Sequence, residues 1–346
     1  MGSKIKINNK IRSKRMAGIS ALPRTHSRTH SPIDDDDDAL TPPLPRTHSR
    51  THSPIDDDAL TPPLSRFERF KRYILTDKVL GKGSYGEVVV ALDLENHGRK
   101  VAIKFCYISG CCAKVLEEVQ MEARIGMQIP DHPNVCKTID SFIIQGILYI
   151  VMEMVEGVSF DIYMRVNKLT DANLFTFGMI LHQMASAIKH LHANQIIHRD
   201  IKPANFVISQ NPDGSPLVKL IDFGFSTKYV DTVQKTQGTP IFVSPEVARE
   251  KDIDHKSDSW AFGVLILQLL TQKDLLWYLE NVKRTDRAYQ IIRNLTVNPF
   301  PAYLAENENP MFVLIANTAI KCLEIDKSKR SSVAEIAECL SVFKAQ

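Results

Sequence analysis

Two short stretches of sequence decide the fold: residues 198–205 read HRDIKPAN, and residues 218–224 read VKLIDFG. In the first, a lysine and an asparagine follow Asp200 by two and five residues, and in the second an apolar strand pattern ends on Asp222. Asp200, Asn205 and Asp222 could be unrelated surface polar residues, but the occurrence of all three in one register disfavours that interpretation.

Upstream of these stretches, residues 81–86 read GKGSYG, with glycines at Gly81, Gly83 and Gly86. Two unrelated nucleotide-binding folds use this spacing, so the context must distinguish them. A dinucleotide-binding turn would open a helix, whereas here residues 87–91, EVVVA, continue as a strand. The pattern therefore predicts a flap between two strands, in which the glycines let the backbone approach phosphates closely. An ordinary hairpin turn is the alternative.

A lysine within an apolar strand follows the glycines, in residues 101–104, VAIK. A charge at Lys104 requires a partner. The helix expected over residues 114–127 offers several glutamates, of which Glu118 and Glu122 are four residues apart and share a face. The sequence leaves the choice between these two open.

In their order and spacing, these elements resemble the eukaryotic protein kinase family, of the serine/threonine type. The resemblance covers residues 70–346 and implies an α+β, bilobal protein-kinase fold with a strand-rich N-lobe, about 70–154, and a helical C-lobe, about 155–346. Local patterns agree with this division. Strands are expected at residues 88–92, 101–105 and 147–152, and long helices at 174–193 and 257–271.

The resemblance implies ATP and Mg²⁺ as cofactors and assigns a task to each motif. Asp200 would accept or orient the proton of the substrate hydroxyl, Lys202 would lie near the γ-phosphate, and Lys104 would position the α- and β-phosphates. The implied catalytic residues are Asp200, Lys202, Lys104 and Glu122, and the implied Mg²⁺ ligands are Asn205 and Asp222.

The same resemblance implies a set of nucleotide-contacting positions. Residues 148–155, LYIVMEMV, would form the strand and hinge behind the adenine, with Met152 as gatekeeper and backbone groups of Glu153 and Val155 facing the base. Without the resemblance, such an apolar run would be read as core. The full set is Gly81, Gly83, Gly86, Val88, Ala102, Lys104, Met152, Glu153 and Val155.

Two further features concern the framework. Ser244-Pro245-Glu246 stands where the family has Ala-Pro-Glu, and the resemblance implies an ion pair between Glu246 and Arg330. Gly126, four residues after Glu122, stands where the family usually has a bulky apolar residue, and a glycine inside a helix costs about 1 kcal/mol. This glycine keeps the glutamate register open.

Composition limits the remaining possibilities. The 346 residues are 44% hydrophobic and 24% charged with a net charge of +3, which excludes wholesale disorder and gives no sign of nucleic-acid binding. The six cysteines show no CxxC spacing, which favours reduced thiols. Long apolar runs and a signal peptide are absent, so the sequence predicts a soluble intracellular protein, cytoplasmic or nuclear, with no membrane partner.

A tandem repeat precedes the kinase-like region: residues 45–64 repeat residues 23–44 without two of the aspartates. These Pro-, Ser-, Thr- and Asp-rich units contain no aromatic residue and cannot bury enough apolar surface to fold alone. We therefore expect residues 1–64 to be a disordered low-complexity tail that is dispensable for catalysis.

These observations predict an ATP- and Mg²⁺-dependent serine/threonine kinase that acts on protein substrates. A pseudokinase serving as a binding or scaffold module is the alternative, disfavoured because Lys104, Asp200 and Asp222 are all present. Arg199 suggests regulation by an upstream kinase acting on Thr232 or Thr236, because a phosphate on the following loop would supply the opposite charge.

Overall fold

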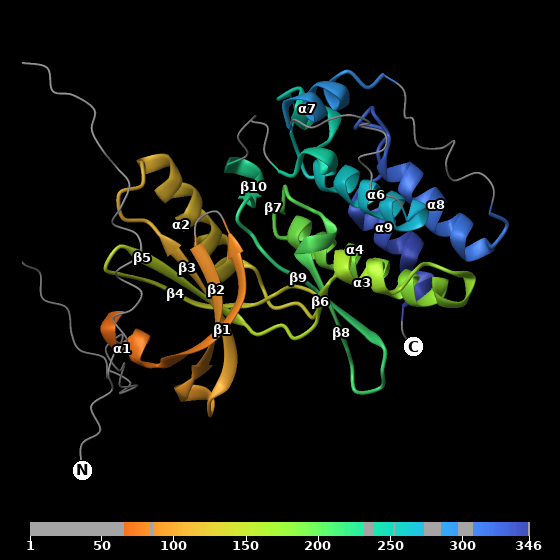
Figure 1. Ribbon diagram of the computed structural model, residues 1–346. Helices are drawn as coiled ribbons and strands as arrows, with labels where there is room; N and C mark the ends of the chain where they lie inside the picture. Colours follow the sequence, from red (N-terminus) through yellow and green to blue (C-terminus); the bar gives the residue numbers. More distant parts are fainter. Residues whose placement is uncertain are drawn as a thin grey trace, which may run out of the picture. The chain divides into compact units, whose positions relative to one another are not determined.

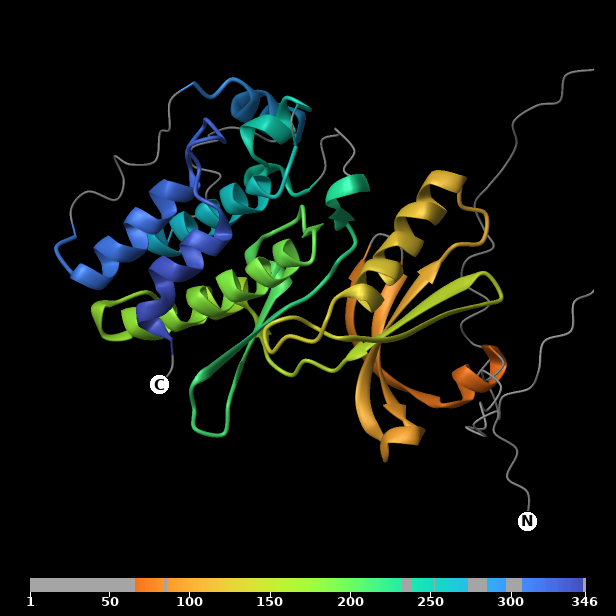
Figure 2. The ribbon, with the colours of Figure 1, turned by 180° about the vertical axis from the view of Figure 1, so that it is seen from behind.

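A computed structural model describes residues 66–83, 86–231, 238–251, 253–272, 285–296 and 307–344. All of them lie in Thr61–Gln346, the second of the two units into which the chain divides. Figures 1 and 2 show this unit from opposite sides. The predicted tail with its repeats lies outside the described residues, as do Thr232 and Thr236.

Five antiparallel strands form the main sheet of the strand-rich part, in the order β1-β2-β3-β5-β4 (Figure 1). β-Branched and aromatic residues dominate these segments, as expected for a pleated and half-buried surface. The predicted strands are confirmed to within two residues at each end. The observed bounds are β1 Tyr73–Gly83, β2 Gly86–Asp93, β3 Arg99–Tyr107, β4 Thr138–Ile144 and β5 Ile147–Glu153.

Different helices cover the two faces of this sheet (Figure 2). On one face lies α2, Ala113–Gln128, which packs through residues such as Ala123. On the other face lies α1, Arg66–Lys71, whose Phe70 ring centroid is 5.3 Å from that of Tyr149. Because side chains alternate across a strand, each face of the sheet has its own apolar cluster.

The helical part contains the largest core, formed mainly by four helices (Figure 1). These are α4 Leu174–Ala193, α6 Lys256–Thr271, α8 Pro310–Cys322 and α9 Val333–Cys339. Three shorter helices are α3 Phe160–Val166, α5 Pro245–Ala248 and α7 Thr285–Arg293. The two predicted long helices correspond to α4 and α6. No helix among the described residues is long and apolar enough to cross a membrane.

Short strands flank the two stretches at residues 198–205 and 218–224. They are β6 Val158–Ser159, β7 Ile196–Ile197, β8 Phe206–Gln210, β9 Pro216–Leu220 and β10 Thr227–Lys228. The first stretch connects β7 to β8, and the second ends just after β9. With a strand-rich part followed by a helical part, the predicted α+β, bilobal protein-kinase fold is confirmed.

The glycine that kept the helix register open is explained by packing. α2 continues through Gly126 without interruption, and a Cβ atom there would overlap Thr138 Oγ1 of β4. A larger side chain would force the helix away from the sheet, so glycine allows a close approach. In the resulting register, Glu122 faces Lys104 of β3.

Candidate active site

The loop between β7 and β8 is anchored by one buried carboxylate of α6. Asp258, 1% exposed, accepts hydrogen bonds from the backbone nitrogens of His198 and Arg199, both at 2.8 Å, and from His192 Nε2 at 2.8 Å. Arg199 itself has a positive φ of 67°, a conformation that few residues other than glycine adopt. Three bonds to one carboxylate therefore fix an unusual backbone turn immediately before Asp200.

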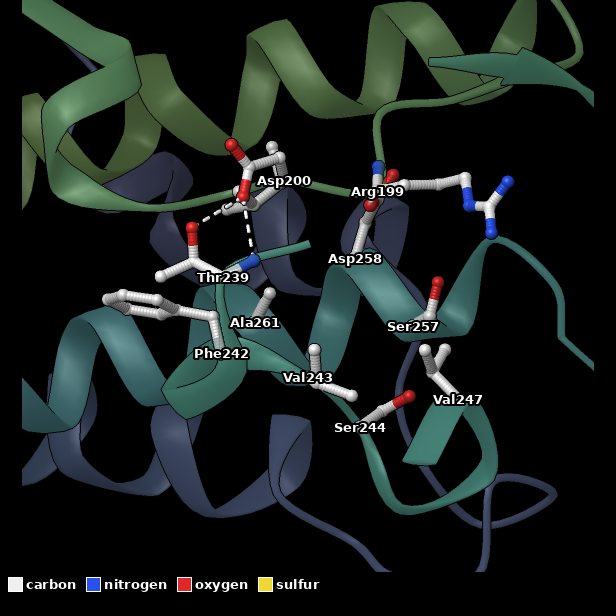
Figure 3. Close-up of a pocket in the computed structure, with 11 residues that line it drawn as sticks. Arg199, Asp200, Thr239, Phe242, Val243, Ser244, Val247, Ser257, Asp258 and Ala261 are labelled. Carbon is white, nitrogen blue, oxygen red and sulfur yellow. Dashed lines mark hydrogen bonds between the residues drawn. The ribbon is translucent and has the colours of Figure 1, made fainter. Parts of the chain in front are cut away.

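Both oxygens of Asp200 are held by neighbouring groups. Oδ1 accepts bonds from Thr239 Oγ1 at 2.8 Å and Thr239 N at 3.0 Å, and Oδ2 accepts bonds from Lys202 Nζ at 2.6 Å and Asn205 Nδ2 at 3.2 Å. Figure 3 shows Asp200 and Thr239 facing one another beside a small cavity of about 20 Å³. The carboxylate is therefore held in one orientation.

Thr239 is a site residue that the sequence analysis did not identify. It belongs to the segment before α5, about forty residues after Asp200 in the chain, and it also accepts a bond from Lys202 Nζ at 3.0 Å. Its signal in the sequence is weak, because a Gly-Thr-Pro tripeptide ordinarily indicates only a turn. The structure thus links the segment before α5 directly to Asp200.

Lys104 contacts two carboxylates at once. Its Nζ is 2.5 Å from Glu122 Oε1 and 3.2 Å from Asp222 Oδ1. Burial alone would lower the pKa of Lys104, but the charges of Glu122 and Asp222 outweigh burial and raise it above its ordinary value. Lys104 therefore stays protonated, and the ammonium bridges the strand-rich part and the segment after β9.

The two carboxylates around Lys104 differ in their environment. Burial raises the pKa of Glu122, and the neighbouring charge of Asp222 raises it further, against the attraction of Lys104. Desolvation also opposes ionisation of Asp222, yet the attraction of Lys104 holds the pKa of that group below its ordinary value. One ammonium thus serves two acids, and Asp222 is the more exposed, with 43% of its side chain accessible against 6% for Glu122.

Asn205 and Asp222 lie at the ends of paired strands. Phe206 of β8 pairs with Leu220 of β9, and Ile221 N donates to Asn205 O at 2.9 Å, which brings the two predicted Mg²⁺ ligands to the same end of the hairpin. Asn205 Nδ2 donates to Asp200 O at 2.8 Å, so the amide oxygen is the group able to bind a cation.

These oxygen donors fit Mg²⁺ chemically. Among the described residues, no group of three or more His, Cys, Asp or Glu side chains could hold a metal ion alone. Mg²⁺ is commonly held by one or two protein ligands together with water and substrate phosphates, and a carboxylate and an amide oxygen suit this role.

The sheet register brings the predicted nucleotide-contacting side chains together. Val88 pairs with Lys104, and Ala102 pairs with Met152. Directly paired residues share a face, as do residues two apart on one strand. Val88, Ala102, Lys104 and Met152 therefore lie on the face that α2 covers, and Glu153 ends β5 at the connection to the helical part.

The glycines lie in the hairpin of β1 and β2, where Gly81 pairs with Val88 and Gly83 with Gly86. A Cβ atom on Gly86 would overlap the carbonyl oxygen of Phe105 on β3, so only glycine permits this strand spacing. The hairpin agrees with the predicted flap, although residues 84–85 at its tip are outside the described residues.

The predicted pair between Glu246 and Arg330 is present. Arg330 Nη1 and Nη2 donate to the two Glu246 carboxylate oxygens at 2.5 and 2.9 Å. Arg330 Nε and Nη1 also donate to the carbonyls of Glu324 and Lys256 at 2.9 Å each, and the guanidinium lies 5.2 Å from the centroid of Trp260. This pair fixes the start of α5 to the helical core.

The fold and the arrangement of these residues define a class of protein. The model of the protein kinase domain matches residues 74–340. The chain belongs to this family.

Relatives of the chain include three named kinases. It is 35% identical over 209 residues to the serine/threonine-protein kinase DCLK1 of Rattus norvegicus, which covers 60% of this chain and 46% of that protein. It is 36% identical over 209 residues to Nek1 of Mus musculus, covering 59% and 16%. It is 34% identical over 202 residues to calcium-dependent protein kinase 5 of Plasmodium berghei (strain Anka), covering 58% and 34%. The matched region spans less than half of each of these relatives.

Proposed function

We propose that this protein is an ATP- and Mg²⁺-dependent protein kinase that phosphorylates serine and threonine hydroxyls. One observation supports the proposal most: Lys104 contacts both Glu122 and Asp222 while Asp200 is oriented by Lys202 and Thr239. Phosphoryl transfer depends on positioning and positive charge, and this arrangement provides both.

In the proposed reaction, the substrate hydroxyl oxygen forms a bond to the γ-phosphorus, and the bond from that phosphorus to the bridging β–γ oxygen breaks. The bond electrons leave with ADP, and the hydroxyl proton passes toward Asp200. Lys202, 2.6 Å from Asp200, is close enough to neutralise charge on the transferred group. Mg²⁺ bound by Asn205 and Asp222 would neutralise phosphate charge.

Protein rather than small-molecule substrates are supported by the segment that contains Thr239. This segment leads into α5 and lies beside Asp200 through two bonds from Thr239. A peptide placed along it would present its hydroxyl to Asp200. The serine/threonine type is supported by Lys202, and two of the named relatives, DCLK1 and Nek1, are serine/threonine-protein kinases.

We expect the enzyme to lack two common preferences for residues that flank the target serine or threonine. Kinases that select arginine before the target usually carry glutamates where this chain has Ala204 and Ser159, and those that select a following proline usually have arginine where it has Val243. Ser159 is the N-cap residue of α3 and carries no charge. A peptide library dominated by arginine three residues before the target, or by proline after it, would contradict this expectation.

The function is tested with the purified full chain, labelled ATP, Mg²⁺ and a serine/threonine peptide library. Replacement Asp200→Asn should lower kcat by about 10²-fold or more, because it removes the proton acceptor, while nucleotide affinity stays near that of the wild type. Asp213→Asn, in the exposed turn between β8 and β9, is the matched control and should be as active as the wild type. An Asp200→Asn protein with wild-type kcat would refute the mechanism, and a folded wild type without transfer would favour the pseudokinase alternative.

A further inference from the structure

A second cavity, of about 270 Å³, shares only Glu153 with the predicted site residues. It is bounded by the segment between α2 and β4, by the end of β5 and by β9. Four charged side chains line it: Asp131, Lys137, Glu153 and Lys219. The cavity therefore lies where the strand-rich part meets β9, the strand that leads into Asp222. Its charged side chains come from both of these parts.

The Glu153 side chain is bonded to both of these elements. Its Oε1 accepts a bond from Lys219 Nζ of β9 at 2.6 Å and another from the backbone nitrogen of Lys137 at 2.8 Å. Lys219 Nζ also donates to the carbonyl of Val135 at 3.3 Å. A single carboxylate oxygen thus joins the end of β5, the α2–β4 segment and β9.

The elements that meet at Glu153 lead directly to the reacting groups. Lys219 is three residues before Asp222 on the same chain segment. The α2–β4 segment follows the helix that carries Glu122, and it is bonded to β9 through Cys136 N to Leu220 O and Leu220 N to Asn134 O, both at 2.8 Å. A shift of β9 against this segment would therefore alter the distance between Lys104 and its two carboxylates.

The other charged pair of the cavity provides an internal comparison. Lys137 Nζ lies 2.6 Å from Asp131 Oδ2, but the two side chains are 53% and 70% exposed. The Lys219 and Glu153 side chains are only 16% and 17% exposed. Exposed pairs contribute little because solvent screens them, whereas a partly buried pair with additional hydrogen bonds holds its geometry.

We propose that the ion pair between Glu153 and Lys219 is a positioning device for catalysis, which rests on the proposed kinase function. The pair acts through the backbone: it keeps β9, and with it Asp222, in register with the α2–β4 segment, and with it Glu122. The side chain of Glu153 thereby has a role separate from the backbone contact with adenine that the family resemblance implies for this residue.

The test measures kcat, the KM for ATP and the Mg²⁺ dependence of the full chain well below its unfolding temperature. Lys219→Met and Glu153→Gln should each lower kcat by roughly fivefold and raise the Mg²⁺ concentration needed for half-maximal rate. The double variant should be no slower than either single variant, because one interaction is lost in all three. Lys137→Met, which removes the exposed pair in the same cavity wall, is the control and should match the wild type.

A conservative replacement and a readout independent of turnover separate this proposal from the proposed function. Lys219→Arg retains the charge and should recover most of kcat. Amide hydrogen exchange should show weaker protection of residues 134–137 and 220–224 in Lys219→Met, with α6 unchanged. Unchanged exchange, an unchanged or higher kcat, or additive losses in the double variant would overturn the proposal. A wild type without transfer but with these exchange changes would refute only the kinase function.

Discussion

Two buried groups of charged side chains in this molecule, one around Arg330 and one around Lys104, differ in their balance of positive and negative charge. At Arg330, one guanidinium meets one carboxylate through two bonds, further N–H groups donate to backbone carbonyls, and the guanidinium lies over the ring of Trp260. At Lys104, one ammonium faces two carboxylates, Glu122 and Asp222, and burial raises the pKa of Glu122. The first set of charges is balanced, whereas the second contains an excess of negative charge.

The difference separates a structural pair from one suited to catalysis. A balanced and fully bonded pair gains nothing by exchanging partners, so Arg330 is suited to holding α5 in place. In the proposed reaction, an ammonium shared between two acids would be available to phosphate oxygens, and Asp222 would hold a cation. The comparison predicts that the Lys104 group affects rate more than stability, and the Arg330 pair the reverse.

The largest expected effect is on the rate. Lys104→Met removes the positive charge that would face the phosphates, and kcat/KM should fall by about 10²-fold or more, with the thermal unfolding midpoint changed little. Lys100→Met is the control, because Lys100 lies four residues earlier on β3 and forms an exposed pair with Glu156. Steady-state kinetics measures kcat/KM of both variants, and a thermal melt measures their unfolding midpoints. Equal kcat/KM of Lys104→Met and Lys100→Met would contradict the catalytic role of the Lys104 group.

The next effect is on stability. Arg330→Met leaves Glu246 buried without its partner and should reduce the free energy of unfolding by about 3–5 kcal/mol. Denaturant unfolding measures the loss, and the folded fraction should retain most of its activity at low temperature. Arg165→Met, which removes an exposed pair with Asp161 on α3, should cost less than about 0.5 kcal/mol. If Arg330→Met reduced the free energy of unfolding as little as Arg165→Met, the structural role of the Arg330 pair would be contradicted.

A smaller effect concerns pH. Hydrogen bonds from Arg72 lower the pKa of Asp93 to about 2 from its ordinary value of 3.8. Because the folded pKa is the lower one, this stabilisation is complete above the ordinary value and is lost as the pH falls through about 2. Asp93→Asn should therefore cost about 2 kcal/mol near neutral pH and progressively less below about pH 4.

Glu122 should behave in the opposite way. Because burial raises its pKa, ionisation of Glu122 is less favourable in the folded chain than in the unfolded chain, and Glu122→Gln should cost little stability or increase it at neutral pH while lowering kcat. Denaturant unfolding of Asp93→Asn and Glu122→Gln at several pH values measures how each substitution changes the free energy of unfolding, and in which direction. Similar pH dependence in the two variants would contradict the opposite directions in which Arg72 shifts the pKa of Asp93 and burial shifts that of Glu122.

The smallest expected effect is that of removing residues 1–64. Every residue of both ion pairs lies at or after Lys104, and the repeats contain little apolar surface. A chain beginning at Ser65 should therefore have the kcat and unfolding midpoint of the full chain. A severalfold change in either quantity would show that the repeats act on the kinase domain.

Much of the fold was predictable because its signals are local. The glycine hairpin, the strand with Lys104 and the stretches around Asp200 and Asp222 each combine a short motif with a regular hydrophobic pattern. The choice between Glu118 and Glu122 was not predictable, since both lie on one face of α2 and only the packing of Gly126 on Thr138 fixes the register.

Contacts between segments that are distant in the chain could not be predicted from the sequence either. Thr239 reaches Asp200 only because the segment before α5 folds back on the loop between β7 and β8, and nothing in the residues around Thr239 encodes that approach. The bond from Lys219 to Glu153 joins positions 66 residues apart. Patterns of hydrophobicity describe single elements and their faces, whereas such pairs depend on how the elements pack.

The most direct test of the account is Mg²⁺-dependent transfer of labelled γ-phosphate from ATP to serine or threonine peptides by the wild type and by Asp222→Asn. The substitution keeps the size of the side chain, removes its charge and leaves Lys104 with Glu122 alone. The account predicts transfer by the wild type and a loss of about 10²-fold or more in the variant, with little loss of stability. Wild-type activity in the folded Asp222→Asn protein would contradict it.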